Sequence, residues 1–376
     1  MSAVCNAVFL VFAVLGAADY LMDNRWGLGA QFERGLGCMG KLIIAMAGFM
    51  ALAPVLGELL APVATPLFQS VGADPSALAG LLLANDSGGA ALAEELALDP
   101  IAGDFNGYFV ASMMGGAVMC MIPMTMLSTD QASRTPAIYG LIIGLFSIPF
   151  GCLLGGALAG YPLGTVLQNL LPTALLSAAL FLALVFFGRW VIRPFQIFGK
   201  LLMAMSLTGL LLLTAWELLD VELVPHLTPF SEIIPVIGNI ALALSGVFPL
   251  MAVVSRLLCR PLQMAAQRLK VREGDVTGLL TSAVNIFPTF DMLNKMTPKG
   301  VLLNTAFMVG ANCMLGDHFA FTSQMRPVLV LPVLLAKAVS GFLALAVANY
   351  LAPILLKGTK KQPNSASSTC QSIKKE

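Results

Sequence analysis

Residues 77–93 read ALAGLLLANDSGGAALA, a short polar turn inside an otherwise apolar run. An ionisable side chain in a membrane segment costs about 2.5–3.5 kcal/mol on insertion scales and usually faces a partner, a cavity or a substrate path. Asn85, Asp86 and Ser87 offer a carboxylate and hydrogen-bonding groups, and two glycines after them let backbone approach a ligand. We predict that this turn binds a small cation in a transporter. The structural alternative is that Asp86 caps a helix start.

The composition predicts a membrane protein. The 376 residues are 58% hydrophobic and 11% charged, with a mean hydropathy of +0.86. Such a chain cannot form one water-soluble core with a charged surface, and crossing about 30 Å of hydrocarbon takes about 20 apolar residues. We expect an all-α polytopic protein with about 9–11 transmembrane helices. Apolar runs of suitable length cover residues 3–20, which has no signal-peptide flanks, 36–60, 107–127, 138–160, 165–188, 199–216, 233–254, 301–321 and 328–356.

Charge and cysteine usage exclude several classes of function. The net charge is +1, and the basic residues are spread over loops, so we expect no nucleic-acid partner. The seven cysteines show no C-x-x-C spacing and are predicted to be reduced packing residues. No spacing resembles a phosphate-binding loop. We therefore predict no cofactor and no metal, and a lipid bilayer and a small molecule as partners.

The distribution of Lys and Arg predicts the topology, because basic loops lie on the cytoplasmic side. All basic loops share that side only if residues 77–98 enter and leave the membrane on the same side. Residues 276–296 have basic residues at both ends and should do the same. We predict two re-entrant hairpins. Residues 357–376 are rich in Lys and Ser, and we expect a disordered cytoplasmic tail.

Internal similarity predicts the same architecture. Within a transmembrane domain of residues 1–356, we expect repeat one at about 3–160, a linking helix at about 165–188 and repeat two at about 199–356. The hairpin topology makes the repeats inverted, which is typical of secondary transporters. Three residues recur 199 positions later, Pro62 as Pro261, Ala84 as Ala283 and Asp86 as Asn285, and Phe109 recurs as Phe307 one position off that register.

Asn285 is thus the repeat counterpart of Asp86. Pro288 follows it, and a proline there breaks the helix and frees carbonyl groups that accept bonds from a hydroxyl or an ammonium. A plain kink without a ligand is the alternative. Asn312 lies on the next apolar run and could bind substrate or form an interhelical hydrogen bond.

Asp317 and His318 follow Gly316 within the apolar run 301–321. Adjacent helical positions point about 100° apart, so we expect only one of the two to face substrate. A cation site and a proton-titrating pair both stay open, because His changes charge near about pH 6.5. The structural alternative is that Asp317 bonds to backbone or to Asn312 and that His318 bonds to a carbonyl.

The stretches GADPSALAGLLLANDSGG, FQIFGKLL, GVFPLMAVVSRLLCRPL and CMLGDHFAF, taken in this order, resemble the EutH-type ethanolamine permeases over nearly the whole chain. That resemblance implies a multi-pass protein of the bacterial inner membrane that moves ethanolamine into the cell for ethanolamine utilisation. It assigns no ligand residues, so Asp86, Asp317 and His318 rest on the physical argument.

We therefore expect a transporter and not an enzyme, working by facilitated diffusion or secondary transport with alternating access. Ethanolamine is protonated at neutral pH, which suits a carboxylate partner. The alternatives are a carrier of another amine or a nucleoside, and an intramembrane aspartyl hydrolase that uses Asp86 and Asp317 as paired acids. Choline would need an aromatic cage, for which Phe105, Tyr108 and Trp216 are candidates. Coupling and homo-oligomer formation stay open.

Overall fold

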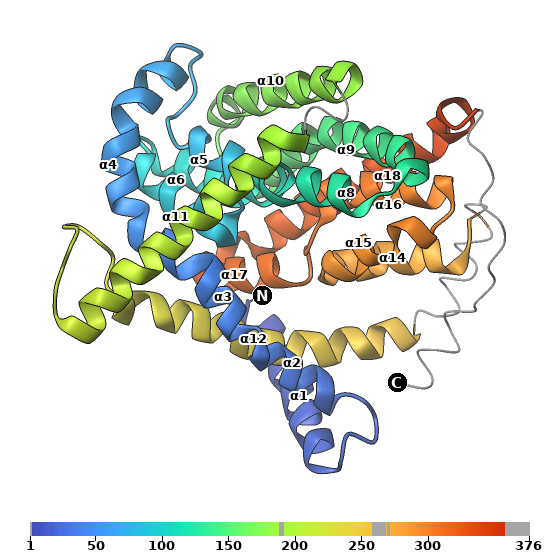
Figure 1. The fold of residues 1–376 in the computed structure, drawn as a ribbon, viewed down its shortest axis with the longest axis horizontal. Helices are drawn as coiled ribbons and strands as arrows, with labels where there is room; N and C mark the ends of the chain where they lie inside the picture. Colours follow the sequence, from blue (N-terminus) through green and yellow to red (C-terminus); the bar gives the residue numbers. More distant parts are fainter. Residues whose placement is uncertain (1, 188–191, 258–267, 269–270, 358–376) are drawn as a thin grey trace.

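The computed structural model describes residues 2–187, 192–257, 268 and 271–357, and every element in these ranges is a helix (Figure 1). Residues 358–376 of the predicted tail (357–376) and Pro261 of the repeat register lie outside the described residues. The elements of the first part of the chain are α1 (Ser2–Leu21), α2 (Gly29–Gly37), α3 (Met39–Leu42), η1 (Ile43–Ala47), α4 (Gly48–Gln69), α5 (Ala77–Leu82), η2 (Asn85–Gly89), α6 (Ala90–Leu96), α7 (Pro100–Asp104), η3 (Phe105–Gly115), η4 (Ala117–Met121), α8 (Ile122–Ser128), α9 (Gln131–Leu158) and α10 (Leu163–Phe187).

The remaining elements belong to the second part of the chain. They are α11 (Ile192–Leu219), α12 (Phe230–Leu257), α14 (Glu273–Val284), α15 (Phe287–Met292), η6 (Leu293–Lys295), α16 (Pro298–Ala311), α17 (Asp317–Met325), η7 (Pro327–Leu329) and α18 (Val330–Leu355). Of the short η elements in the two parts of the chain, η1 to η4 are π-helical and η6 and η7 are 3₁₀-helical.

In the described residues, seven helices are long and apolar enough to cross a membrane, which supports the predicted polytopic class. This number is below the predicted one. The predicted span at residues 301–321 is divided between α16 and α17, because the chain leaves the helix at Asn312 (φ −53°, ψ 136°). The seven are Gly48–Gln69, Pro100–Ser128, Gln131–Leu158, Leu163–Ala183, Ile197–Leu219, Phe230–Val254 and Pro327–Leu355, and the apolar part of α1, Asn6–Leu21, is shorter.

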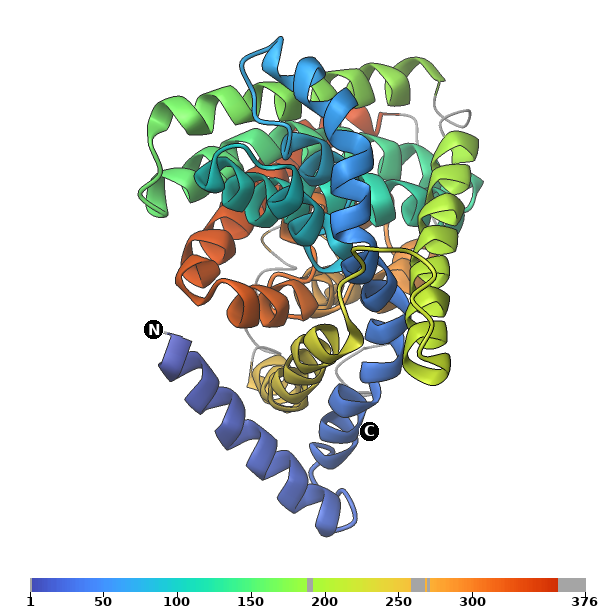
Figure 2. The ribbon, with the colours of Figure 1, turned by 90° about the vertical axis from the view of Figure 1, so that its left-hand side faces the viewer.

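The long helices form a central group with flanking pairs. Helices α9, α16 and α18 pack against one another in the centre, and α10 lies along α9 (Figure 1). Helix α11 pairs with α4 on one flank, while α12 packs against α1 and α2, which form an arm at one end of the molecule (Figure 2). A hydrogen bond between Ser147 Oγ and Ser340 Oγ (2.9 Å) joins α9 to α18. This group is the scaffold behind the two broken segments described next.

Residues 74–128, here called the first unit, contain a helix that breaks and restarts. Helix α5 ends at Leu82, and Leu83 is extended (φ −116°, ψ 140°). The chain then turns through Gly88, whose φ of +93° favours glycine, and continues as α6. A side chain at Gly88 would also meet Phe49.

Residues 273–325, the second unit, repeat this pattern. Helix α14 ends before Asn285, which is extended (φ −150°, ψ 124°), and Pro288 lies in the first turn of α15, where its missing N–H costs no hydrogen bond. Both breaks fall at the predicted hairpin turns. Re-entry into the membrane stays a prediction.

Contacts of the same kind recur in both units. Gly80 packs against Asn106 in the first unit, and Gly278 packs against Asn304 in the second. Both residues of the second contact lie 198 positions after their counterparts in the first. The helix after each broken segment starts with a capping residue followed by proline, Asp99-Pro100 in the first unit and Thr297-Pro298 in the second. The contacts are thus similar in the two units, while the internal repeat and its inverted orientation stay predictions.

Candidate functional site

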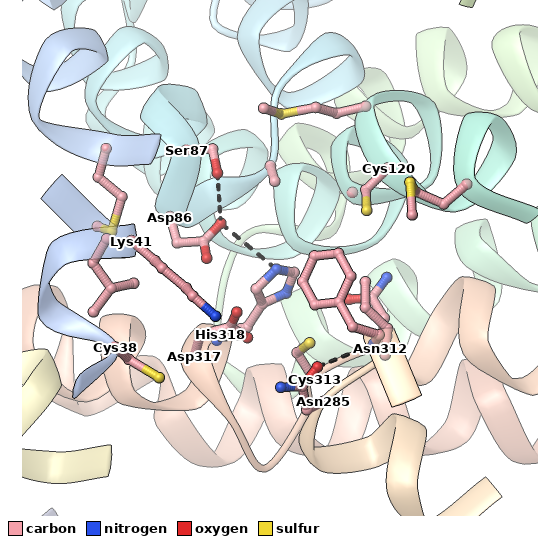
Figure 3. A pocket seen from close by; sticks show the side chains of 18 of the residues that line it. Cys38, Lys41, Asp86, Ser87, Cys120, Asn285, Asn312, Cys313, Asp317 and His318 are labelled. Carbon is pink, nitrogen blue, oxygen red and sulfur yellow. Dashed lines mark hydrogen bonds and ion pairs between the residues drawn. The ribbon is translucent and has the colours of Figure 1, made fainter. Parts of the chain in front are cut away.

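A cavity of about 1040 Å³ lies between the two units. Both breaks reach it, so polar groups from segments far apart in sequence meet there (Figure 3). Its polar lining includes six of the seven residues that the sequence predicts to bind substrate: Asp86, Ser87, Asn285, Asn312, Asp317 and His318.

Asp86 and His318 form the inner end of this cavity. Asp86 Oδ1 lies 3.6 Å from His318 Nε2, and the side chains are 11% and 8% exposed. Ser87 Oγ donates to the same carboxylate oxygen at 3.3 Å. The break after α5 places Asp86 in a turn instead of a regular helix, and this turns its carboxylate toward α17. A buried carboxylate with few donors is a favourable partner for a cationic ligand.

Asp317 completes a cluster of three. One ligand atom each from Asp86, Asp317 and His318 lies within 4.8 Å of the other two, a spacing that could hold a cation. The expectation that only one of Asp317 and His318 faces the site is wrong, because both line the cavity. The reason is local geometry. Asp317 is the first residue of α17, where its carboxylate folds back to accept from the His318 N–H (3.0 Å).

The segment between α16 and α17 is held open by the second unit's own break. The Cys313 N–H donates to the Ser282 carbonyl (3.0 Å) and the Leu315 N–H donates to the Ala283 carbonyl (2.8 Å). These carbonyls belong to the last turn of α14, where helical partners run out. Cys313 adopts a φ of 45°, an uncommon conformation for a residue other than glycine. The break after α14 and the break after α16 are therefore joined by hydrogen bonds that stabilise both.

Lys337 is the site residue that sequence reasoning missed. It lies in the third turn of α18 and is 1% exposed. Its ammonium donates to the Ser112 carbonyl (2.7 Å), Asn312 Oδ1 (3.1 Å) and His318 Nδ1 (2.8 Å). A lone lysine within a long apolar run is itself a signal for a functional residue. That signal was available in the sequence.

The three asparagines have different surroundings. Asn85 is not among the described residues that line the cavity; it is fully buried, and neither atom of its amide has a hydrogen-bond partner in the described part of the chain. Asn285 Oδ1 accepts from the Phe287 N–H (3.0 Å), which caps α15. Asn312 joins Lys337 to the Val309 carbonyl. The predicted roles of Asn85 and Asn312 as direct ligands are therefore less well supported than that of Asp86.

The mouth of the cavity is basic. Arg34, Lys41 and Lys200 line it, and Arg34 and Lys41 are exposed. Figure 3 places the side chain of Lys41 on the side of the cavity that holds Asp317. Arg34 lies in α2, Lys41 in α3 and Lys200 in α11, and the distribution of basic residues predicts that all three are on the cytoplasmic side. Phe105, Tyr108 and Trp216, the predicted aromatic cage, are not among the described lining residues.

An ion-pair cluster lies at the other end of the two units. Arg326, the residue after α17, donates through Nε to Asp104 (2.9 Å) and through Nη2 to Glu94 (3.0 Å). Asp317 and Arg326 are at opposite ends of α17, which at 1.5 Å per residue separates the cluster from the cavity by about two turns. Two acidic residues outside the cavity lining, Asp104 and Glu94, thus bind one arginine.

Comparison with known proteins gives one consistent result. Residues 1–351 match the family model described as ethanolamine utilisation protein, EutH. A probable ethanolamine permease EutH of Listeria monocytogenes is 37% identical over 359 residues, 96% of each chain. The uncharacterized protein YxeR of Bacillus subtilis is 36% identical, covering 92% of this chain and 94% of its own length. A probable ethanolamine permease EutH of Salmonella typhimurium is 34% identical, covering 87% and 86%. No solved structure gives a significant match.

Proposed function

The chain belongs to the EutH family of ethanolamine utilisation proteins, and on this basis we propose that it carries ethanolamine across a bacterial membrane through the cavity between its two units. The protein is a multi-pass membrane protein with seven candidate spans in its described residues. Relatives are named as probable permeases and not as enzymes, which agrees with the predicted class.

The charge balance of the cavity supports a cationic substrate. Two carboxylates, Asp86 and Asp317, lie at its inner end, and one buried ammonium, Lys337, lies behind His318. With both carboxylates and Lys337 ionised and the imidazole neutral, these four side chains together carry one net negative charge. A protonated alkylamine such as ethanolamine brings one positive charge and would neutralise it. This imbalance is the observation that carries the proposal.

The proposed roles follow from the donor and acceptor inventory. The substrate ammonium would donate to Asp86 and Asp317, which accept only. The substrate hydroxyl could bond to Ser87 or to the amide of Asn285, both of which line the same cavity. A site built to bond a hydroxyl discriminates against an analogue that lacks it, because buried polar groups are then left unpaired.

We propose that the structure represents an inward-facing state. The cavity opens beside Arg34, Lys41 and Lys200, and basic residues mark the cytoplasmic side, where we also place the tail. At the other end, Arg326 closes the two units against each other through Asp104. Transport by alternating access would require this contact to open while the basic mouth closes.

One observation favours a second candidate function. Asp86 and Asp317 approach each other, as the paired acids of an intramembrane aspartyl hydrolase must do. His318 lies beside both, and its ring hydrogen bond with Lys337 brings a positive charge next to the pair, which opposes the sharing of a proton by two acids. The permease relatives also favour transport. A hydrolase would accumulate no amine in sealed vesicles.

Uptake of labelled ethanolamine into proteoliposomes tests the proposal. At about pH 6 passive leak is small, because nearly all of the amine is protonated. We expect saturable uptake by the wild type, and uptake close to that of empty liposomes for Asp86→Asn and for Asp317→Asn. Asp99→Asn is the matched control, because Asp99 caps α7 outside the cavity and Asn is an equally good cap.

The outcomes separate the candidates. Wild-type uptake no faster than in empty liposomes would refute ethanolamine transport. Saturable uptake of labelled uridine that ethanolamine does not compete with would identify a nucleoside carrier. Normal uptake in both aspartate variants would keep the carrier but remove these carboxylates from the binding site. Competition by choline would test whether the phenylalanines that line the cavity, Phe49, Phe248 and Phe287, act as an aromatic cage in place of the predicted one.

A further inference from the structure

Among the residues that the structure describes, no carboxylate contacts Lys337 directly, although its helix is the candidate span with the highest hydropathy. Its three hydrogen-bond partners are a backbone carbonyl, an amide oxygen and an imidazole nitrogen. A charged ammonium has three donors, so these partners satisfy it completely. Lys337 is also not among the described residues that line the cavity. It therefore cannot reach the substrate and must act through its neighbours.

The three partners come from three different segments. Ser112 belongs to the π-helical η3 of the first unit, Asn312 lies at the break between α16 and α17, and His318 lies on α17. Oxygen and nitrogen atoms arranged at a helix break are the kind of site where transporters hold a coupling cation. Here a side-chain ammonium, fixed to α18, occupies that position. The chain supplies this positive charge itself.

The contact with Lys337 determines the state of His318. An ammonium can only donate, so Nδ1 of the imidazole must accept and carries no proton. A neutral imidazole then has its proton on Nε2, the nitrogen that faces Asp86 Oδ1 at 3.6 Å. The ring is thereby held as a neutral donor toward the cavity. A second positive charge on His318 is disfavoured by the ammonium beside it.

From these contacts we propose that Lys337 is a positioning residue for substrate selection. It holds His318 neutral with Nε2–H toward Asp86 and offsets one of the two carboxylate charges, so that the cavity selects a substrate with a single positive charge and requires no metal cation. The inference rests on the proposed function, because it concerns the charge of the substrate that the same cavity binds. Beyond the proposed function, we infer that the cavity binds doubly charged amines less tightly than ethanolamine, because only one of its two carboxylate charges is left without a neighbouring ammonium.

The test compares two amines of nearly equal size. Ethylenediamine replaces the hydroxyl of ethanolamine with a second amino group, and at about pH 6 it is mostly a dication. We measure binding of labelled ethanolamine to the purified full-length protein in detergent and its displacement by each unlabelled amine. In the wild type, ethanolamine should displace the label at a concentration about tenfold or more below that of ethylenediamine.

Lys337→Gln removes the buried positive charge, so that the two carboxylate charges of Asp86 and Asp317 are no longer offset by a neighbouring ammonium. The preference for ethanolamine over ethylenediamine should then fall by about tenfold or more, or reverse. Lys337→Arg keeps the charge and should keep the wild-type preference. Ser340→Ala is the matched control, one turn away on α18 and bonded to Ser147 instead of the site. A merely structural role of Lys337 would weaken both amines equally.

Sodium dependence of the wild type gives a test that requires no variant to fold. Replacing Na⁺ by K⁺, which carries no amine or hydroxyl group, should change the apparent affinity for ethanolamine by less than about twofold, because Lys337 takes the position of a coupling cation. A tenfold or larger loss of affinity for ethanolamine without Na⁺, which corresponds to about 1.4 kcal/mol of binding free energy, would overturn the inference.

The results also distinguish this inference from the proposed function. If the wild type binds neither amine, the proposed function fails and this inference fails with it. If the wild type binds ethanolamine but folded Lys337→Gln keeps the wild-type ratio of the two amines, only the role of Lys337 is refuted. A shifted ratio in Lys337→Gln, with an unshifted ratio in Lys337→Arg and Ser340→Ala, supports both.

Discussion

The two broken units share a framework and differ in where they carry charge. In the first unit the carboxylate of Asp86 lies on the break itself, and the helix that follows, Pro100–Ser128, continues without interruption. In the second unit the break carries the neutral Asn285, and the following helix breaks again before Asp317. The site therefore combines the turn after α5 in the first unit with the break between α16 and α17 in the second unit. These two breaks are not equivalent positions of the two units.

This difference indicates how a repeated fold can form an asymmetric site. The contacts that the units share involve glycine, backbone and capping groups, which set the shape of each broken segment. The residues that differ are those that face the cavity. A substrate with an ammonium at one end and a hydroxyl at the other needs such asymmetry, because a cavity with two identical ends would bind it in either direction.

The largest effect is expected when the carboxylate on the first break is removed. Asp86→Asn should abolish detectable ethanolamine binding, because truncating one partner of a buried charged contact costs about 2–5 kcal/mol. Asn285→Ala should cost far less, since the Asn285 amide is partly occupied in capping α15. Equilibrium binding of labelled ethanolamine in detergent measures both.

The double variant Asp86→Asn with Asn285→Asp provides the control for net charge. It restores the number of carboxylates but moves one to the second unit, away from His318, so we expect binding to stay lost. Recovery of wild-type affinity in the double variant would contradict the asymmetric site and favour two interchangeable turns.

Glycine substitutions should give the next largest effect, on stability. In each unit a glycine contacts a carbonyl at the end of the broken helix, Gly115 against Leu83 and Gly316 against Val284. An added methyl group would collide with that carbonyl, and overpacking of this kind costs about 1–3 kcal/mol. We expect Gly115→Ala and Gly316→Ala each to lower the midpoint of thermal unfolding in detergent.

Gly238→Ala is the matched control, because no atom lies within 4 Å of the added methyl group on α12. It should leave the midpoint unchanged or raise it, since alanine favours helices over glycine by about 1 kcal/mol. An equal loss in all three variants would mean that the close approach of glycine to backbone is not what these positions require.

The asparagines behind the breaks should have a smaller and similar effect in both units. Asn106 donates to Ser76 and Asn169, both at 2.9 Å, and Asn304 donates to two backbone carbonyls. Hydrogen bonds between helices in membrane proteins average about 0.6 kcal/mol, with about 1.7 as the largest. We expect Asn106→Ala and Asn304→Ala to lower the midpoint of unfolding by similar amounts. Thermal denaturation in the same detergent measures this midpoint.

Ethanolamine affinity should change little in these two variants, because neither side chain is among the described residues of the cavity lining. A large loss in one unit with no loss in the other would show that the paired contacts are not equivalent and would weaken the case for a repeat.

Much of this arrangement could be predicted from sequence, because a charge inside an apolar run is a strong local signal. Asp86, Asp317 and His318 were each identified in this way. Lys337 carries the same signal but lies in the very apolar run 328–356, where the average hydropathy favours a plain span. Reading single ionisable residues before averaging over a window would have identified it.

The remaining differences come from tertiary contacts that no local pattern specifies. The break at Asn312 is stabilised by bonds from the Cys313 and Leu315 N–H groups to α14, about thirty residues earlier in the chain. Nothing within the run 301–321 predicts it. Asn85 illustrates a second limit. Its neighbour Asp86 faces the cavity, but the turned backbone directs Asn85 elsewhere, and sequence proximity alone does not resolve such directions.

The smallest expected effect concerns the cluster that joins the two units far from the cavity. Arg326 is 34% exposed and its partner Glu94 is 60% exposed, so water screens these ion pairs. Exposed pairs contribute about 0.2–1 kcal/mol. Arg326→Gln should therefore barely change the unfolding midpoint. If the cluster closes the outer path, the same small energy favours the inward-facing state, and its loss should change ethanolamine uptake by no more than about fivefold.

A double-mutant cycle decides whether this contact couples the units. Arg326→Gln, Asp104→Asn and the double variant are compared for uptake rate in proteoliposomes at low and high salt. A coupling energy that is measurable at low salt and vanishes at high salt identifies the pair as an electrostatic closure between the units. Additive effects at both salt concentrations would reduce it to a surface contact. The asymmetry between the units would then reside entirely in the cavity, where Asp86 and Asp317 lie on non-equivalent breaks.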